Sequence, residues 1–149
     1  MTTSFPLGQT VTLNGMQMYY VLAGRGEPLV LLHGYTGSSK DWTLFYDELA
    51  KEYQLVIPDL RGHGRSTNPS KGFTHRQAAS DVVALLDHLG IEHFKAIGVS
   101  GGGNILLHLA TQHPSRVVAM VLVSATSYFP EQARTFMRHY AVDKLTDEE

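Results

Sequence analysis

Hydrophobic residues recur with two different periods along the chain, and the period changes at turn-forming residues. Residues 8–13 and 16–23 flank Asn14-Gly15, a dipeptide that tolerates the positive φ of a two-residue turn, so this part predicts a β-hairpin. Further along, short apolar runs without alternation are typical of parallel strands that are covered on both faces. These runs are 29–32, 55–57, 94–99 and 117–123.

Stretches with helical spacing of apolar residues separate these runs. Residues 42–49 form the first, and residues 74–77 form a capping box that starts a second helix, which Gly90 ends. A third helix over residues 105–110 stops before Pro114, because proline does not continue a helix. This alternation predicts an α/β fold, in which the hairpin precedes four strands of a mostly parallel sheet.

The last part of the chain has an apolar face of its own. Pro130 opens a stretch in which apolar residues within 133–140 recur at i, i+3, i+4 and i+7, which predicts an amphipathic helix packed on another surface. A second capping-box pattern stands at residues 146–149, and no helical pattern follows it in the sequence.

Composition narrows the class of protein. A chain of 149 residues with 43% hydrophobic residues is expected to form one globular domain. A formal charge of −2 gives no basic surface for nucleic acid, so we expect no nucleic-acid partner. No apolar run approaches the roughly 20 residues that cross a bilayer, and no secretion signal is visible, so we expect no membrane partner and a cytoplasmic location. The absence of Cys excludes disulfides and thiolate catalysis.

One motif predicts a catalytic nucleophile. Residues 98–102 read Gly-Val-Ser-Gly-Gly between a buried strand and a helix, which is the context of a nucleophile elbow. We expect a strained backbone at Ser100, and glycines at 98 and 102 that let the strand and the helix approach each other. A phosphate-binding turn is the alternative, but the sequence matches neither Gly-x-Gly-x-x-Gly nor a Walker motif.

A second loop, residues 33–39, leaves a buried strand and leads into a helix. If Ser100 attacks a carbonyl, the oxyanion needs two donors, and the N–H of Gly101 together with one from this loop would supply them. His33 begins the loop beside the glycine that turns the chain, which favours a structural role for it. The alternative is that His33 acts as a catalytic base.

A third loop, residues 59–66, also follows a predicted strand. Asp59 and Arg61 could contact substrate, but an internal ion pair and backbone hydrogen bonds that shape the loop are the favoured interpretation. The other histidines outside these loops lack metal-ligand spacing and are expected at the surface or at helix ends. They are His75, His88, His93, His108, His113 and His139. We expect no metal and no cofactor.

These three motifs, in this order and on these elements, resemble the α/β-hydrolase family, near its esterase, perhydrolase and carbon–carbon hydrolase branches. The resemblance covers about residues 8–125. It implies that Ser100 is the nucleophile and that the backbone N–H groups of Tyr35 and Gly101 form the oxyanion hole. Because the elbow carries Ser and not Asp, it also points away from dehalogenase and epoxide hydrolase chemistry, and toward acyl transfer from a small ester-like substrate.

By the same resemblance, the acid and the histidine of the triad would come from later strands. We therefore expect a truncated core, with residues 1–127 as its N-terminal half and 128–149 as the start of a cap-like helical segment. Three hypotheses stay open. The chain is a serine hydrolase completed by a partner or by His33 or His63, a catalytically incomplete half of one, or a non-catalytic interaction module.

The family's strand order also places residues 116–124 at an edge of the sheet. An apolar and uncharged edge pairs readily with other chains, so we expect a homo-oligomer, such as a homodimer, or pairing with a complementary hydrolase half. The substrate itself is left open by the sequence.

Overall fold

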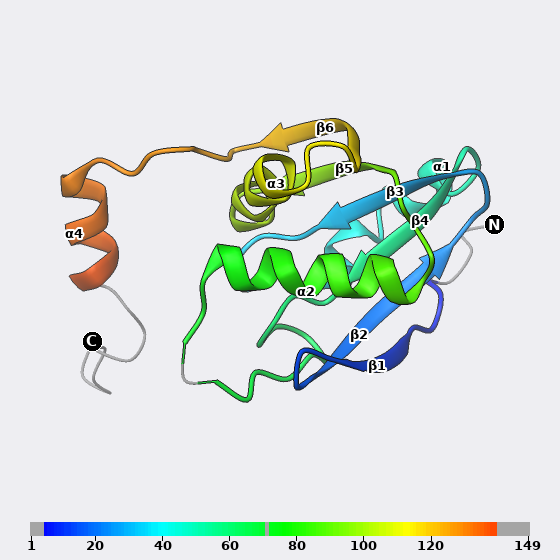
Figure 1. Ribbon diagram of the computed structural model, residues 1–149, viewed down its shortest axis with the longest axis horizontal. Helices are drawn as coiled ribbons and strands as arrows, with labels where there is room; N and C mark the ends of the chain where they lie inside the picture. Colours follow the sequence, from blue (N-terminus) through cyan, green and yellow to red (C-terminus); the bar gives the residue numbers. More distant parts are fainter. Residues whose placement is uncertain (1–4, 71, 140–149) are drawn as a thin grey trace.

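The computed structural model describes residues 5–70 and 72–139, and it shows one six-stranded sheet with helices on both faces (Figure 1). The strands lie in the order β1-β2-β4-β3-β5-β6. Their bounds are β1 Gln9–Leu13, β2 Met16–Ala23, β3 Glu27–Leu32, β4 Tyr53–Pro58, β5 Phe94–Val99 and β6 Val117–Val123. The hairpin β1-β2 and the β2-β4 pair are antiparallel, and the remaining neighbours are parallel. The predicted fold class, a mostly parallel sheet with an N-terminal hairpin, is confirmed.

Local signals in the sequence set several element boundaries. Asn14 and Gly15 both have positive φ, as the two-residue turn requires, and Leu13 pairs with Met16 across it. The hydroxyl of Thr74 accepts a hydrogen bond from the Gln77 N–H, which caps the second predicted helix. The helices are η1 Ser39–Trp42, α1 Tyr46–Leu49, α2 His75–His88, α3 Gly101–Gln112 and α4 Glu131–His139.

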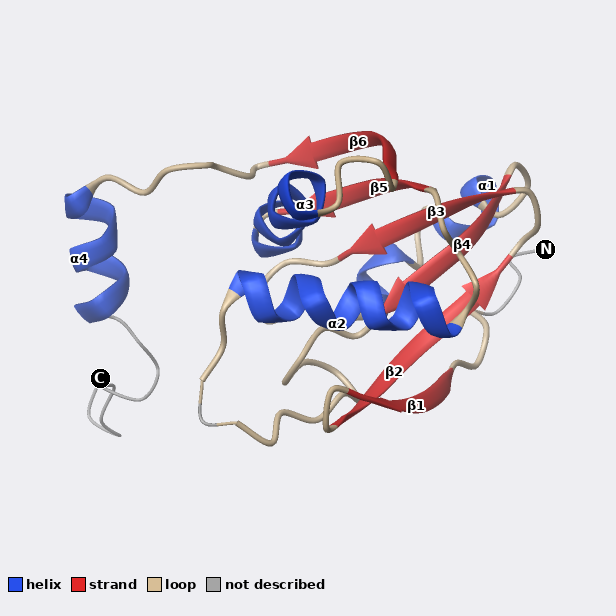
Figure 2. Cartoon of the chain, viewed as in Figure 1, coloured by secondary structure: helices blue, strands red, loops and turns tan. Residues whose placement is uncertain are grey.

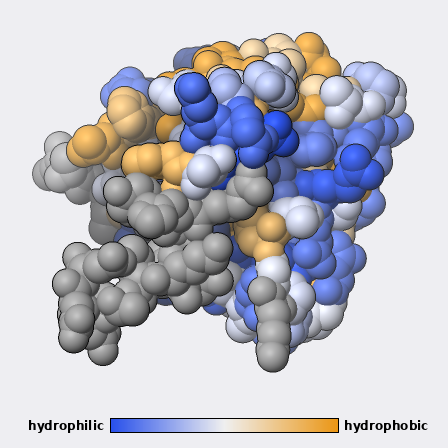
Figure 3. Space-filling view, turned by 90° about the vertical axis from the view of Figure 1, so that its left-hand side faces the viewer, coloured by the Kyte–Doolittle hydropathy of each residue, from blue (hydrophilic) through white to orange (hydrophobic). Residues whose placement is uncertain are grey.

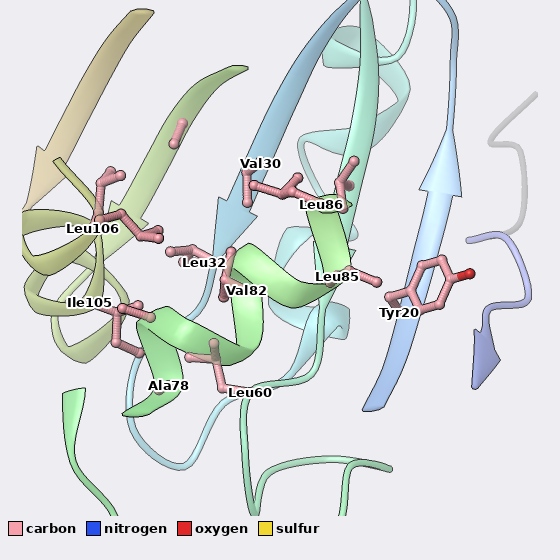
Figure 4. Packing of buried hydrophobic residues seen from close by; sticks show 14 of the residues in the cluster. Tyr20, Val30, Leu32, Leu60, Ala78, Val82, Leu85, Leu86, Ile105 and Leu106 are labelled. Atoms are coloured by element: carbon pink, nitrogen blue, oxygen red, sulfur yellow. The ribbon is translucent and has the colours of Figure 1, made fainter. Parts of the chain in front are cut away.

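Alternate residues of the inner strands bury two separate cores. On one face, Val30 and Leu32 of β3 pack under α2 and α3, as Figure 4 shows for α2. On the other face, Leu29 and Leu31 of the same strand pack against η1 and α1. Burial on both faces explains why the central strands read as continuous apolar runs, and it makes the centre of the sheet a rigid platform.

The first predicted helix differs from expectation, because residues 42–49 do not form one continuous helix. A 3-10 turn ends at Trp42, and a separate short helix begins at Tyr46. The Thr43 hydroxyl and the Thr43 N–H both bond the Lys40 carbonyl, which is the acceptor that an uninterrupted helix would offer to Leu44. Trp42 and Tyr46 are nevertheless both buried against the sheet, so the spacing correctly identified the buried face.

The edge strand β6 contrasts with the centre of the sheet. Val117 is partly buried, but the larger apolar side chains after it are exposed, from 37% for Leu122 to 62% for Val118. Hydrophobic side chains gather along the upper edge of the molecule in Figure 3, which is the edge that β6 forms in Figure 1. The predicted position of residues 117–123 at a sheet edge is confirmed.

An extended segment links β6 to α4 (Figure 2). The predicted amphipathic helix is found over Glu131–His139, but Phe136 on its apolar side is 62% exposed, so the expected burial of that side is not seen. Tyr140 and the capping-box pattern at 146–149 lie outside the described residues. Within the described ranges, no helix is both long and apolar enough to cross a membrane.

Candidate active site

Ser100 stands between β5 and α3, at the end of the sheet to which β3, β5 and β6 all point (Figure 2). Its backbone has φ 52° and ψ −117°, a conformation that residues with a side chain rarely adopt. The Ser100 N–H donates to the Val123 carbonyl at 2.7 Å and its carbonyl accepts from the Asn104 N–H at 3.0 Å. The backbone is therefore held in place on both sides, as the strained turn predicted at this position requires.

Two glycines make this turn possible. A Cβ on Gly98 would lie 2.7 Å from the Gly102 carbonyl oxygen and from the Gly103 Cα. A Cβ on Gly102 would collide with the carbonyl oxygens of Leu32 and His33 on the neighbouring strand. The sequence predicts this close approach of strand and helix from the glycines at 98 and 102, and the structure confirms it.

The loop after β3 lies directly against the Ser100 turn. Gly34 and Gly37 close a tight turn through a 3.2 Å hydrogen bond, and a Cβ on Gly34 would lie 3.9 Å from the Ser100 Oγ. The Tyr35 nitrogen is 3.6 Å from where a Cβ on Gly101 would stand. Within the described ranges, neither the Tyr35 N–H nor the Gly101 N–H has an acceptor. The backbone nitrogens of Tyr35 and Gly101 therefore lie close to each other next to the Ser100 turn.

His33 is almost completely buried, and both of its ring nitrogens are engaged. Because Nδ1 lies 2.7 Å from the Gly34 carbonyl, that nitrogen carries the proton. Nε2 then accepts from the Leu60 N–H at 3.0 Å. Burial lowers the pKa of His33, which keeps the ring neutral. The imidazole ties the loop after β3 to the loop after β4.

His63 is arranged differently. Its Nδ1 lies 2.9 Å from the Arg61 carbonyl, so the proton is on Nδ1 and Nε2 keeps its lone pair. Among the described residues, Nε2 has no hydrogen-bond partner. The ring centroid is 6.0 Å from that of Tyr35 and 5.8 Å from that of Phe73. His63 and Gly101 line the same narrow gap, which is too small to hold a water molecule.

The loop at residues 59–66 uses its polar groups internally. The Asp59 carboxylate accepts from the Ser39 N–H at 2.6 Å and from the Arg65 N–H at 2.8 Å. Arg61 makes a two-pronged ion pair with Asp81 of α2, at 2.7 and 2.8 Å, and both side chains are buried. The hydrogen bond from Arg61 to Asp81 raises the pKa of the guanidinium. Arg61 therefore forms an ion pair, as expected, but its partner is Asp81 on α2 and not a residue of the loop itself.

A group of rings beside the site was not anticipated from the sequence. Tyr35 contacts Phe73 and His75, and His75 stacks on His108 with ring centroids 6.4 Å apart. Burial, followed by repulsion from His108, lowers the pKa of His75, and burial raises the pKa of the Tyr35 hydroxyl. These residues belong to different elements, so no local pattern brings them together.

Comparison with known proteins gives consistent matches. A family model described as the alpha/beta hydrolase fold matches residues 27–144. A soluble epoxide hydrolase from Corynebacterium sp. (strain C12) is 36% identical over 134 residues, which cover 85% of this chain and 47% of that protein. A non-heme chloroperoxidase from Streptomyces lividans is 38% identical over 125 residues, which cover 80% of this chain and 45% of that protein.

A solved structure is similar to this chain as well. The crystal structure of a hydrolase from Pseudomonas aeruginosa PA01 has a TM-score of 0.86 with 26% sequence identity, and the match covers 94% of this chain and 54% of that one. The chain thus spans about half the length of the curated relatives named above.

Proposed function

Because the chain belongs to the alpha/beta hydrolase fold family, we propose that it carries the nucleophile and oxyanion hole of a serine hydrolase acting on small ester-like substrates. One observation carries the proposal: Ser100 sits in a strained turn at the start of a helix, near two backbone N–H groups that have no acceptor among the described residues. In the same proposal, residues 1–127 are the N-terminal half of the catalytic core and 128–149 begin a cap-like segment.

The chemistry is acyl transfer. The Ser100 Oγ attacks the substrate carbonyl carbon while its proton passes to a base, and the carbonyl oxygen becomes an oxyanion. The N–H groups of Tyr35 and Gly101 stabilise that charge, and the positive end of the α3 dipole adds to them. The leaving alcohol takes up the proton, and water then releases the acid from the serine ester. One oxyanion donor is worth about 10²–10³ in rate.

Of the two histidines that could act as a local base, the geometry favours His63. A base needs an unoccupied lone pair, and the Nε2 of His33 already accepts from the Leu60 N–H. Among the described residues, the Nε2 of His63 has no hydrogen-bond partner, and His63 adjoins the same narrow gap as Gly101. We therefore propose His63 as the base of this chain on its own, and a partner as the source of any further triad residue.

The similarity to an epoxide hydrolase makes epoxide opening the main competing reaction. Attack of a carboxylate on an epoxide carbon gives an ester, which water can cleave. Attack of the Ser100 hydroxyl would give an alkyl ether, which an oxyanion hole cannot help to cleave because an ether has no carbonyl. Serine at the elbow therefore supports ester chemistry for this chain.

Hydrolysis of p-nitrophenyl butanoate tests the proposal. The folded chain should hydrolyse the ester faster than buffer does, because Ser100 forms the serine ester and the oxyanion hole stabilises the charge that develops. Ser100→Ala should reduce the rate to that of buffer, and His63→Asn should reduce it more than His33→Asn does at equal folded fraction. Unchanged hydrolysis by Ser100→Ala would refute the proposal.

A second function, self-association, is favoured by the exposure of β6. We propose that a second copy of the chain pairs with this edge, since two identical edges can meet antiparallel about a twofold axis. Val118 and Val121 are more than half exposed on a strand without charged residues.

Sedimentation velocity tests the pairing. The wild-type chain should show a concentration-dependent dimer, and Val118→Lys with Val121→Lys should shift it to monomer. Leu44→Lys is the matched control, because Leu44 is an exposed apolar residue away from β6. A wild-type chain that stays monomeric at micromolar concentration would contradict this proposal.

A further inference from the structure

The turn between β1 and β2 carries a chemically reactive pair of residues. Asn14 and Gly15 are both exposed at the tip of the hairpin, and among the described residues no atom lies within 4 Å of where a Cβ on Gly15 would stand. In an Asn-Gly pair, the glycine nitrogen can attack the side-chain carbonyl carbon of the asparagine, and the side-chain amide leaves as ammonia. Water then opens the cyclic imide to aspartate or isoaspartate. The tip of the hairpin is therefore sterically open to deamidation.

The side chain of Asn14 is in direct contact with a buried charge. Its Nδ2 donates to the Oδ1 of Asp81 on α2 at 3.0 Å. Asp81 is only 1% exposed, and the same carboxylate forms the two-pronged ion pair with Arg61. Because an ionised carboxylate only accepts hydrogen bonds, the amide must present its NH₂ group to it. An exposed turn is thus linked to the buried ion pair by one hydrogen bond.

Deamidation would reverse the sign of this contact. The NH₂ donor would become a carboxylate oxygen, and two like charges would face each other across the former hydrogen bond. The Arg61 guanidinium is already engaged, because its Nε and Nη2 donate to Asp81 and its Nη1 donates to the Asn68 side chain. One guanidinium would then face two carboxylates. Isoaspartate would also add a carbon to the backbone, which a two-residue hairpin turn does not accommodate.

We propose that Asn14 is a deamidation site of the folded chain, and that its modification weakens the buried Arg61–Asp81 ion pair and destabilises the fold. β1 is an edge strand, so local opening of the hairpin can release Asn14 from Asp81 while the centre of the sheet stays folded. The proposal is independent of the chemistry at Ser100.

The two other asparagines serve as internal controls. Asn68 precedes Pro69, whose nitrogen carries no hydrogen to lose when a cyclic imide forms. Asn104 is buried within α3, where the helix fixes the backbone around it. We therefore expect modification to be confined to Asn14.

Peptide mass spectrometry tests the modification. The folded wild-type chain is incubated in slightly alkaline buffer beside a sample unfolded in urea, and both are then digested. The peptide that contains Asn14 should gain one mass unit in the folded sample and separate into aspartate and isoaspartate forms, while the peptides of Asn68 and Asn104 stay unchanged. An Asn14 that stays intact in the folded chain while the unfolded chain is converted would overturn the proposal.

Urea denaturation of Asn14→Asp and Asn14→Gly tests the link to the ion pair. Both variants remove the hydrogen bond to Asp81 and keep a residue that suits the turn, but only Asn14→Asp adds a charge. Asn14→Asp should have an about tenfold smaller folding equilibrium constant than Asn14→Gly, as like charges a few ångströms apart near a surface imply. High salt should narrow this difference, because it screens charges that are partly exposed.

Equal stability of the two variants would overturn the link. The incubated wild-type chain, measured in the same way, should unfold at lower urea than fresh protein does. This measurement decides the question even if Asn14→Asp does not fold, and an incubated chain that carries the modification with an unchanged urea midpoint would also contradict the proposal.

Discussion

The loop after β4 and the turn after β5 follow strands on either side of β3 in the same sheet, yet they use their polar groups in opposite ways. In the loop at residues 59–66, the carboxylate of Asp59 and the guanidinium of Arg61 are both buried and fully committed to internal partners. At the turn, the Ser100 hydroxyl and the N–H groups of Tyr35 and Gly101 have no acceptor or donor among the described residues.

This difference separates groups that hold the fold from groups that are available for chemistry. The polar residues of the loop after β4 fix its shape, and His33 links it to the loop after β3. At the Ser100 turn, the hydroxyl makes no hydrogen bond that would fix the shape of the chain, and the backbone is strained. Substitutions in the first region should therefore lower stability, and those in the second should remove chemistry while leaving stability unchanged or higher.

The largest effect is expected for Asp81→Ala. It leaves the buried guanidinium of Arg61 without its partner, which costs about 3–5 kcal/mol of unfolding free energy. Urea denaturation followed by circular dichroism measures the change. Glu48→Ala is the control, because it breaks the exposed ion pair with Lys51 and should cost under about 1 kcal/mol. Equal losses for the two variants would contradict a structural role for the buried pair.

A smaller change, of opposite sign, is expected for Ser100→Gly. Glycine relieves the strain of φ 52° at the cost of a more flexible unfolded chain, so this variant should be about 1 kcal/mol more stable than Ser100→Ala. Ser124→Gly is a matched control, since Ser124 has φ 53°. It should gain similar stability and keep ester hydrolysis, whereas Ser100→Gly should lose hydrolysis. A less stable Ser100→Gly would show that the turn is not strained.

The smallest effect concerns pH. Burial lowers the pKa of His33 below 6.5, so the folded chain binds fewer protons than the unfolded chain in acid. Its contribution to stability is complete above pH 6.5 and is lost as the pH falls from there through the folded pKa. Urea midpoints at pH 8, 6.5 and 5 should fall less steeply in His33→Asn than in the wild type. Parallel pH profiles would mean that His33 is not the buried neutral ring described here.

Local signals were sufficient for most of the fold. The hairpin follows from Asn14-Gly15, the start of α2 follows from the Thr74 cap, and the glycines around Ser100 predict the strained turn. Each of these features depends on the backbone geometry of a few consecutive residues, so the residue types at those positions are enough to predict it. The broken helix at 42–49 was missed because the Thr43 hydroxyl competes for a backbone carbonyl.

The candidate site was less predictable, because its details depend on contacts between distant segments. The partner of Arg61 is on α2, twenty residues later, and the partner of the His33 Nε2 depends on how two loops meet. Within the described part of the chain, the Trp42 Nε1 and the His63 Nε2 have no hydrogen-bond partner, and no local sequence pattern predicts this. The sequence named the residues of the site, and tertiary packing decided which of their polar atoms are left available.

Labelling with a fluorophosphonate probe tests the central claim most directly. Peptide mass spectrometry of the labelled wild-type chain should place the phosphonyl group on Ser100, and Ser100→Ala should remain unlabelled while Ser124→Gly labels normally. Labelling at another residue, or a well-folded wild-type chain that takes up no probe, would contradict the assignment of Ser100 as an activated nucleophile.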